Sequence, residues 1–153
     1  MPPSATSLER LTIELRACFN RLKAVSDALC ADLGLNASMR AVLEALDHGG
    51  EQQVPDIARA RGVSRQHIQV NMDALMALCL VEVRDNPAHR RSPLYALSNR
   101  GKTLFGQIRQ REAAVFARLA ARFDEPELAA TCTTLEALKS GLDAELEGGH
   151  SNA

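Results

Sequence analysis

Apolar side chains near the start of the chain recur at alternating steps of three and four residues, which is the spacing of one face of an α-helix. They are Leu8, Leu11, Leu15, Cys18, Leu22, Val25 and Leu29. The pattern predicts a long first helix with a continuous apolar stripe. The stripe could pack on the chain's own core or on another subunit, and so long a helix at the very start of a small chain favours another subunit.

Residues that end and begin helices then predict two shorter helices. Gly34 stands where a helix would end in a left-handed residue, and Asn36 or Ser38 is able to cap the helix that follows. Pro55 suits the first turn of the next helix, because its missing N–H is not needed there. Gly62 ends that helix after only a few residues.

The short joint RGVS leads into a fourth helix with Ser64 as its N-cap. We expect its apolar side to consist of Ile68, Met72, Leu75 and Leu78. Its other side has no Glu or Lys before Asp73, although a merely solvated helix face usually has them. The polar residues there are Arg65, Gln66, Gln69 and Asn71.

After Leu80 the apolar period changes to two, which indicates a two-stranded hairpin around the polar turn DNPAHRRSP. The tip of this hairpin contains Arg90 and Arg91. We expect one face of the hairpin to consist of Val81, Val83, Leu94 and Ala96.

The remainder of the chain has helical patterns. Ser98 caps a long helix, Pro126 interrupts the pattern, and a last helix runs from about Glu127 to Glu147. Hydrophobic residues make up 46% of the chain and charged residues 24%, as in a globular protein. Aromatic residues are only 3% while Ala and Leu are abundant, which favours a mainly α protein.

Charge is unevenly distributed along the chain. Residues 54–102 contain eight basic and four acidic side chains, so the net charge of −1 divides into +4 for this segment and −5 for the rest. A basic segment between acidic flanks is typical of a chain that meets a polyanion with one part only. No stretch approaches the roughly 18 apolar residues of a membrane span, and no signal peptide is evident, so we expect a cytoplasmic protein without a membrane partner.

The sequence argues against catalysis, metal binding and disulfides. Cys18, Cys30, Cys79 and Cys132 lie far apart without a CxxC pair, so we expect buried or half-buried free thiols. The four histidines include no pair at i, i+4 spacing, so we expect no metal site and no cofactor. There is no GxSxG, no phosphate-binding Gly-rich loop and no HExxH, so we expect a protein that is not an enzyme.

Two short helices joined by a tight turn, followed by a hairpin with a basic tip, define a winged helix–turn–helix. The major groove of B-form DNA admits one helix, and Arg reads guanine there while Gln and Asn read adenine. The polar side of the fourth helix has these residue types, and Arg90 and Arg91 are placed to reach phosphates or a narrow minor groove. A winged-helix module that binds only protein is the alternative, which the residue types on this face disfavour.

The segments VPDIARARGVSRQHIQVNMDALMALCLVEV and RDNPAHRRSPLYALSNRGKTLF resemble the MarR (multiple antibiotic resistance regulator) family of transcription factors. The resemblance is close over about residues 37–106 and one of helical layout elsewhere. It implies a winged helix–turn–helix DNA-binding lobe over residues 37–97 and a helical dimerisation domain over residues 1–36 and 98–153. The DNA-contacting positions of the family fall on Ser64, Arg65, Gln66, His67, Gln69 and the wing arginine Arg91.

The same resemblance implies a homodimer that binds a pseudo-palindromic operator in double-stranded DNA, usually as a repressor. Release follows binding of a small-molecule effector in many members and oxidation in others. Some members sense oxidants through a cysteine of the first helix, which makes Cys18 and Cys30 candidates. The position of Cys18 on the apolar stripe instead favours a buried, inert thiol.

Three residues depart from the family pattern. His89 stands where the wing usually has Asp, so the carboxylate that orients the wing arginine is missing. Asn71 stands where Leu is usual, which favours a partly buried side chain over one that reads a base. Cys79 stands where Gly is usual, and a left-handed backbone at this position would cost a non-Gly residue roughly 1 kcal/mol.

Overall fold

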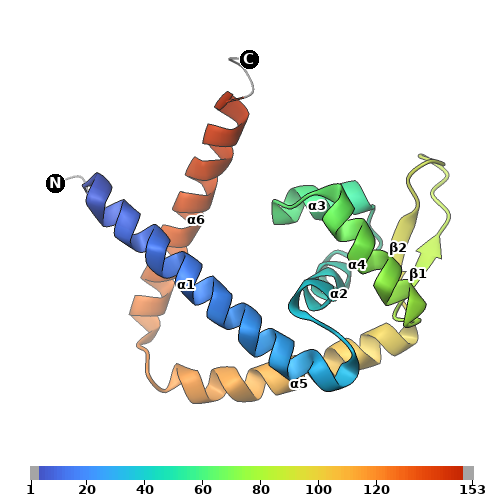
Figure 1. Cartoon of the computed structure of the whole chain (residues 1–153), viewed down its shortest axis with the longest axis horizontal. Helices are drawn as coiled ribbons and strands as arrows, with labels where there is room; N and C mark the ends of the chain where they lie inside the picture. The colour runs from blue at the N-terminus through green and yellow to red at the C-terminus, as the bar shows by residue number, and fades with distance from the viewer. Residues whose placement is uncertain (1–3, 150–153) are drawn as a thin grey trace. The chain divides into compact units, whose positions relative to one another are not determined.

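The computed structural model describes residues 4–149. The elements in chain order are α1 (Ala5–Cys30), the 3-10 helix η1 (Ala31–Leu33), α2 (Ala37–Gly49), α3 (Val54–Arg61), α4 (Arg65–Ala77), β1 (Val81–Arg84), β2 (Leu94–Leu97), α5 (Asn99–Ala120) and α6 (Glu125–Gly149) (Figure 1). The chain separates into two compact units, Met1–Glu112 and Ala113–Ala153, so α5 begins in the first and ends in the second. The predicted mainly α fold with a winged helix–turn–helix is confirmed.

Capping residues account for the helix boundaries in the first unit. Asn36 and Ser64 each accept a hydrogen bond from the backbone N–H three residues later, at the starts of α2 and α4. Pro55 lies in the first turn of α3. Gly34 (φ 70°) and Gly62 (φ 65°) end η1 and α3 in the left-handed conformation that the sequence predicted.

The core of the first unit holds α4 in place. The core is formed by α2, α3 and α4 together with the hairpin and the first part of α5. Figure 1 shows α3 on one side of α4 and the hairpin on the other. Complete burial of each large apolar side chain contributes roughly 1.5–3 kcal/mol. The largest fully buried side chains are Phe105, Leu43, Ile57, Ile68, Met72, Leu75, Leu80 and Ile108. The predicted apolar side of α4 is therefore confirmed, although Leu78 is only half-buried.

A nearly buried ion pair joins α2 to α5. The Arg40 guanidinium donates to both carboxylate oxygens of Glu112, at 2.7 Å each, and lies 5.7 Å from the centre of the Phe105 ring. The Arg40 side chain is 17% exposed and the Glu112 side chain 12% exposed. A second carboxylate, Glu44, accepts from Arg40 at 2.8 Å. The guanidinium and the carboxylate are shielded from solvent by the core, and these contacts provide the hydrogen bonds that water would otherwise supply.

The hairpin has a different buried face from the one that the sequence predicted. Val81 pairs with Leu97 and Val83 pairs with Tyr95, so these side chains share one face. Tyr95 and Leu97 are the buried residues of β2, while Leu94 and Ala96 lie on the other face and are half-buried. The prediction that placed Leu94 and Ala96 with Val81 was wrong, because cross-strand register decides which alternate residues share a face.

The apolar stripe of α1 is largely open to solvent in the single chain. Leu8, Leu15, Leu22 and Val25 are between 37% and 51% exposed. Cys18 on the same stripe is exposed, as are Cys79 and Cys132, and only Cys30 is buried. The expectation of buried or half-buried thiols was therefore wrong for three of the four cysteines. For Cys18 the reason is that α1 packs on the core only near its end.

In the second unit, α6 begins slightly earlier than predicted. Its first residue is Glu125, and Pro126 lies within the first turn instead of interrupting the helix. The apolar residues of this unit are mostly exposed in the single chain, among them Phe116, Leu119, Phe123, Leu128 and Leu142. Among residues 4–149, no helix combines the length and apolar character needed to cross a membrane.

Candidate nucleic-acid interface

The helix–turn–helix is formed by α3 and α4. Gly62 and the residue after it donate backbone hydrogen bonds back to the last turn of α3, which closes a tight joint before Ser64. The hydroxyl oxygen of Ser64 accepts a hydrogen bond from the backbone N–H of His67 and so caps the start of α4. Because Ile68, Met72 and Leu75 are buried, the opposite side of α4 faces solvent along its whole length.

The solvent side of α4 presents polar groups in its first turns. Arg65, Gln66 and His67 are exposed, and Gln69 is half-buried. Within residues 4–149, the Arg65 guanidinium and the Gln66 amide have no ion pair or hydrogen bond with another side chain. These donors and acceptors are therefore available to an external partner.

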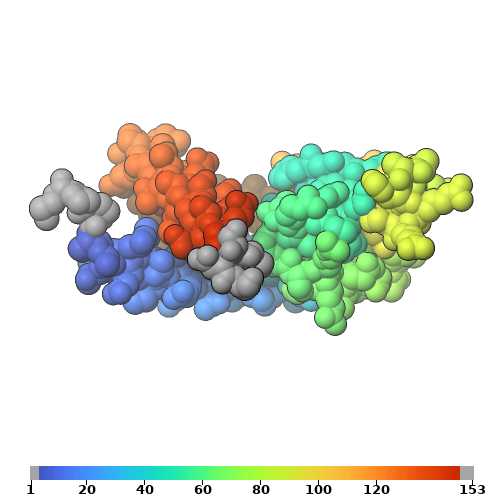
Figure 2. Space-filling model, turned by 90° about the horizontal axis from the view of Figure 1, so that it is seen from above, coloured from blue at the N-terminus to red at the C-terminus, as the bar shows by residue number. Residues whose placement is uncertain are grey.

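The wing places two further guanidinium groups beside this helix. The hairpin turn is closed by Asn86, whose side-chain amide donates to the carbonyl of Ser92 at 2.8 Å, and the backbone N–H of His89 donates to the carbonyl of Asn86. Arg90 and Arg91 are exposed, and neither has an ion pair among the residues that the structure describes. Figure 2 shows the tip of the hairpin, in yellow, standing out from the surface of the first unit.

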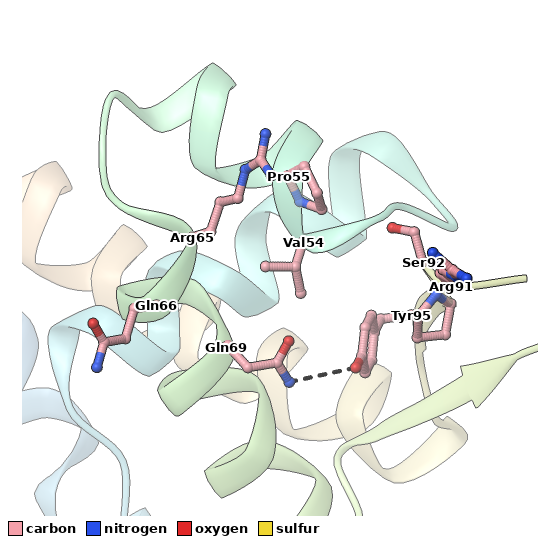
Figure 3. Close-up of a pocket in the computed structure, with 9 residues that line it drawn as sticks. Val54, Pro55, Arg65, Gln66, Gln69, Arg91, Ser92 and Tyr95 are labelled. Atoms are coloured by element: carbon pink, nitrogen blue, oxygen red, sulfur yellow. Dashed lines mark hydrogen bonds between the residues drawn. The ribbon is translucent and has the colours of Figure 1, made fainter. Parts of the chain in front are cut away.

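A hollow of about 280 Å³ lies between α3, α4 and the wing. Its lining comprises Val54, Pro55, Arg65, Gln66, Gln69, Arg91, Ser92, Pro93 and Tyr95. Figure 3 shows Arg65 beside Pro55 on one side of the hollow and Arg91 beside Ser92 on the other, with Gln69 reaching toward Tyr95. The structure thus brings Arg65, Gln66, Gln69 and Arg91 to one surface, whereas Arg90 and His67 do not line the hollow.

Asn71 does not belong to this surface. It is 8% exposed, and its side-chain amide donates to the backbone carbonyl of His67 at 2.7 Å. The inclusion of Asn71 on the polar, base-reading side of the helix was therefore wrong. The expectation drawn from the family pattern, a partly buried side chain, is confirmed, and the burial is more complete than expected.

Sequence reasoning missed two residues of this surface. Val70 is 62% exposed on the solvent side of α4, where an apolar side chain is suited to contact a thymine methyl group. Its signal was an apolar residue out of phase with the buried positions. Tyr95 directs its hydroxyl toward Gln69, at 3.4 Å from the amide nitrogen, and no local pattern indicated this contact between the wing and α4.

The segment after α4 contains a strained backbone conformation at Cys79, a question that the sequence left open. Cys79 has φ 56°, and it is the only non-Gly residue with positive φ among those described. Its carbonyl accepts a hydrogen bond from the Ser98 hydroxyl at 2.8 Å. Ser98 also caps the start of α5, so this contact ties the end of the recognition helix to the next long helix.

The architecture and this surface define a winged helix–turn–helix protein, and comparisons with known proteins show which family it resembles. Residues 33–92 match the family model described as MarR family. A MarR family transcription regulator, SP03579, is 26% identical, with a TM-score of 0.80 over 93% of this chain and 94% of that one. The chain is thus similar to the MarR family in sequence over residues 33–92 and in fold over nearly its whole length, and the members of this family are transcription regulators.

Other relatives are more distant or less complete. An uncharacterized protein of Mycobacterium tuberculosis is 39% identical over 92 residues, which is 60% of this chain and 64% of that protein. The chain therefore spans less than two thirds of the length of this relative. The repressor CouR, bound to a 23-mer DNA duplex, has the same fold at 20% identity, with a TM-score of 0.76 over 91% of this chain and 99% of that one.

Proposed function

We propose that the protein is a homodimeric, sequence-specific DNA-binding regulator that represses transcription until a small-molecule effector releases it. The observation that supports this function is the hollow between α4 and the wing, flanked by Arg65 and Arg91, which have no ion pair among residues 4–149. Arginines without internal partners beside Gln66 and Gln69 suit a surface of phosphates and base edges.

In this proposal, residues 37–97 form the DNA-binding lobe. Ser64, Arg65, Gln66, His67 and Gln69 contact DNA from α4, and Arg90 and Arg91 contact it from the wing. The related fold of CouR, which has been solved on a DNA duplex, supports this assignment. Val70 adds an apolar contact to the same face.

A homodimer would cover the apolar side chains that the single chain leaves exposed. Residues 1–36 and 98–153 supply this dimerisation domain in the proposal. The exposed apolar positions of α1, such as Leu8 and Leu22, recur at the helical spacing of a packed interface. Phe116 (53% exposed) and Phe123 (56% exposed) add large apolar surfaces of the kind that stable dimers bury.

Effector release is supported by proteins of the same fold. Staphylococcus aureus MarR was solved with salicylate and kanamycin, and DNA binding by Bordetella bronchiseptica BpsR is regulated by 6-hydroxynicotinic acid. Of the oxidant-sensing candidates, Cys30 is disfavoured, since burial raises the pKa of its thiol. Cys18 is exposed in the single chain, so a Cys18→Ser variant tests that alternative by the loss of peroxide-dependent DNA release.

The first test is binding to the promoter DNA immediately upstream of the protein's own gene, with salt and random competitor DNA titrated. We expect nanomolar binding that survives competitor, with a two-fold-symmetric footprint and half-sites roughly 34 Å apart. We expect Arg91→Ala to weaken binding to every duplex and to lower the salt dependence by about one phosphate contact.

Arg122→Ala is the matched control, because it removes the same charge at an exposed position outside the lobe. It should leave affinity and salt dependence close to those of the wild type. Weak binding that is equal on all duplexes would contradict the proposed function and favour a module that binds protein.

A further inference from the structure

The side chain of Gln69 is held by contacts from two elements. Its amide nitrogen donates to Asp73 Oδ1, one turn further along α4, at 2.8 Å. The same nitrogen donates to the Tyr95 hydroxyl, which comes from β2 in the wing, at 3.4 Å (Figure 3). Because an amide nitrogen has two hydrogens, these two contacts use its whole donor capacity.

The orientation of this amide follows from the chemistry of its partners. An ionised carboxylate only accepts hydrogen bonds, so the nitrogen and not the oxygen of Gln69 must face Asp73. The carbonyl oxygen of Gln69 is then left without a partner among residues 4–149, on the residue that lines the hollow. The free Gln69 therefore presents one acceptor and no donor to DNA.

Tyr95 is held in place by burial and by backbone hydrogen bonds. The residue is 6% exposed, and it exchanges two backbone hydrogen bonds with Gln52, at 2.8 and 3.0 Å. Its strand also pairs with β1 through Val83. The Tyr95 hydroxyl consequently has little freedom to leave Gln69 when the wing is in place.

Building on the proposed function, we infer that Tyr95 and Asp73 are positioning residues that determine which base Gln69 reads. A free Gln reads adenine with two hydrogen bonds, one from its nitrogen to N7 and one from N6 to its oxygen. With both N–H groups held, Gln69 keeps only the second of these. Adenine and cytosine both present an amino group in the major groove, whereas guanine and thymine present oxygen acceptors. Gln69 thus accepts adenine and cytosine alike and rejects the other two bases.

The test measures base preference with full-length wild-type protein, Tyr95→Phe, Gln69→Ala and the double variant. The affinity of each protein is measured for operator duplexes that have A, C, G or T at one position of both half-sites. This position is the one at which Gln69→Ala abolishes base preference. Loss of the Tyr95 hydroxyl frees one N–H for adenine N7, so we expect the ratio of adenine to cytosine affinity to rise about fivefold. In the Gln69→Ala background, the same substitution should leave the ratio unchanged.

Asp73→Ala provides a second, independent variant at an exposed position, where folding is not at risk. It also removes a negative charge near DNA, so its matched control is Glu82→Ala, which removes an exposed charge from β1. We expect both variants to bind all duplexes more tightly, and only Asp73→Ala to raise the adenine to cytosine ratio.

An unchanged ratio in both Tyr95→Phe and Asp73→Ala, or a shift that persists without Gln69, would overturn the inference while the proposed function stands. A wild-type protein that strongly prefers adenine over cytosine at this position would also overturn it. Failure of the wild-type protein to bind any duplex specifically would instead refute the proposed function together with the inference.

Discussion

Replacement of Cys79 by glycine is expected to stabilise the protein. The backbone N–H of Cys79 donates to the carbonyl of Met76 at 2.9 Å, and that of Leu80 donates to Leu75 at 3.0 Å. These two bonds form the helix-ending motif in which glycine is favoured. The same pair of bonds occurs at Gly34 and Gly62, so Cys79 is the one such site described here that has a Cβ.

The size of the effect follows from two opposing terms. A left-handed backbone costs an L-residue roughly 1–2 kcal/mol relative to glycine. Glycine increases the conformational entropy of the unfolded chain, which opposes this gain by roughly 0.4–1 kcal/mol. The Cys79 side chain is exposed, so its removal costs little packing. A net gain of about 0.5–1 kcal/mol corresponds to a rise in melting temperature of about 1–4 °C for a chain of this size.

The assay is thermal unfolding followed by circular dichroism at one fixed protein concentration, because the melting temperature of a dimer depends on concentration. Cys79→Ala removes the thiol but keeps the Cβ, and it should leave the melting temperature unchanged. Gly62→Ala introduces a Cβ at φ 65° and should lower it. If Cys79→Gly melts at or below the wild-type temperature while Gly62→Ala behaves as expected, the assigned strain at Cys79 is refuted.

Three further predictions concern stability. Glu112→Gln removes one charge of a nearly buried pair with Arg40, so we expect a loss of about 2 kcal/mol in denaturant unfolding, with an unchanged m-value. Gly101→Ala should destabilise the fold by about 2 kcal/mol, because the added Cβ would collide with the backbone carbonyl of Leu80, whereas Gly106→Ala meets open space and serves as its control. The backbone N–H of Ala37 lowers the pKa of Asp27 below its ordinary value of 3.8, so the stabilisation from this carboxylate is present above that value and is lost as the pH falls through the lower, folded-state pKa. We therefore expect the free energy of unfolding of Asp27→Asn to depend less steeply on pH between 5 and 2 than that of the wild type. An acid titration followed by circular dichroism measures this dependence.

Each of these predictions has an outcome that contradicts it. A Glu112→Gln protein as stable as the wild type would mean that Arg40 is satisfied by Glu44 alone. Equal stability of the two glycine variants would show that α5 shifts freely away from Leu80. An unchanged pH profile in Asp27→Asn would mean that the hydrogen bond to Ala37 does not persist in solution.

Much of the fold was predictable because the residues that begin and end its helices act locally. Asn36, Ser64, Gly62 and Pro55 act within one turn of their own helix, and each lies where the sequence predicted. At Cys79 the sequence only raised the question of a left-handed backbone, because the family pattern usually has Gly there, and the structure has φ 56° at this residue. Helix caps and left-handed ends depend on neighbouring residues only, so single-sequence reasoning suffices for them.

The errors concern contacts between segments that are distant in sequence. The buried face of β2 depends on the register of its pairing with β1, which alternation alone leaves open by one residue. Cys18 was expected to be a buried thiol because it lies on the apolar stripe of α1. Such a stripe shows that a helix packs against a partner, but it does not show which chain supplies that partner.

The sequence alone determined the helix order, the caps, the winged helix–turn–helix and the residue types on its polar side, because periodicity and capping are short-range properties. Only the tertiary structure showed that Asn71 turns inward and that Arg65 and Arg91 flank one hollow. It also brought Tyr95 to Gln69, across 26 residues of sequence. Contacts over such separations depend on how the core packs α4 against the wing, and this packing is a property of the whole lobe.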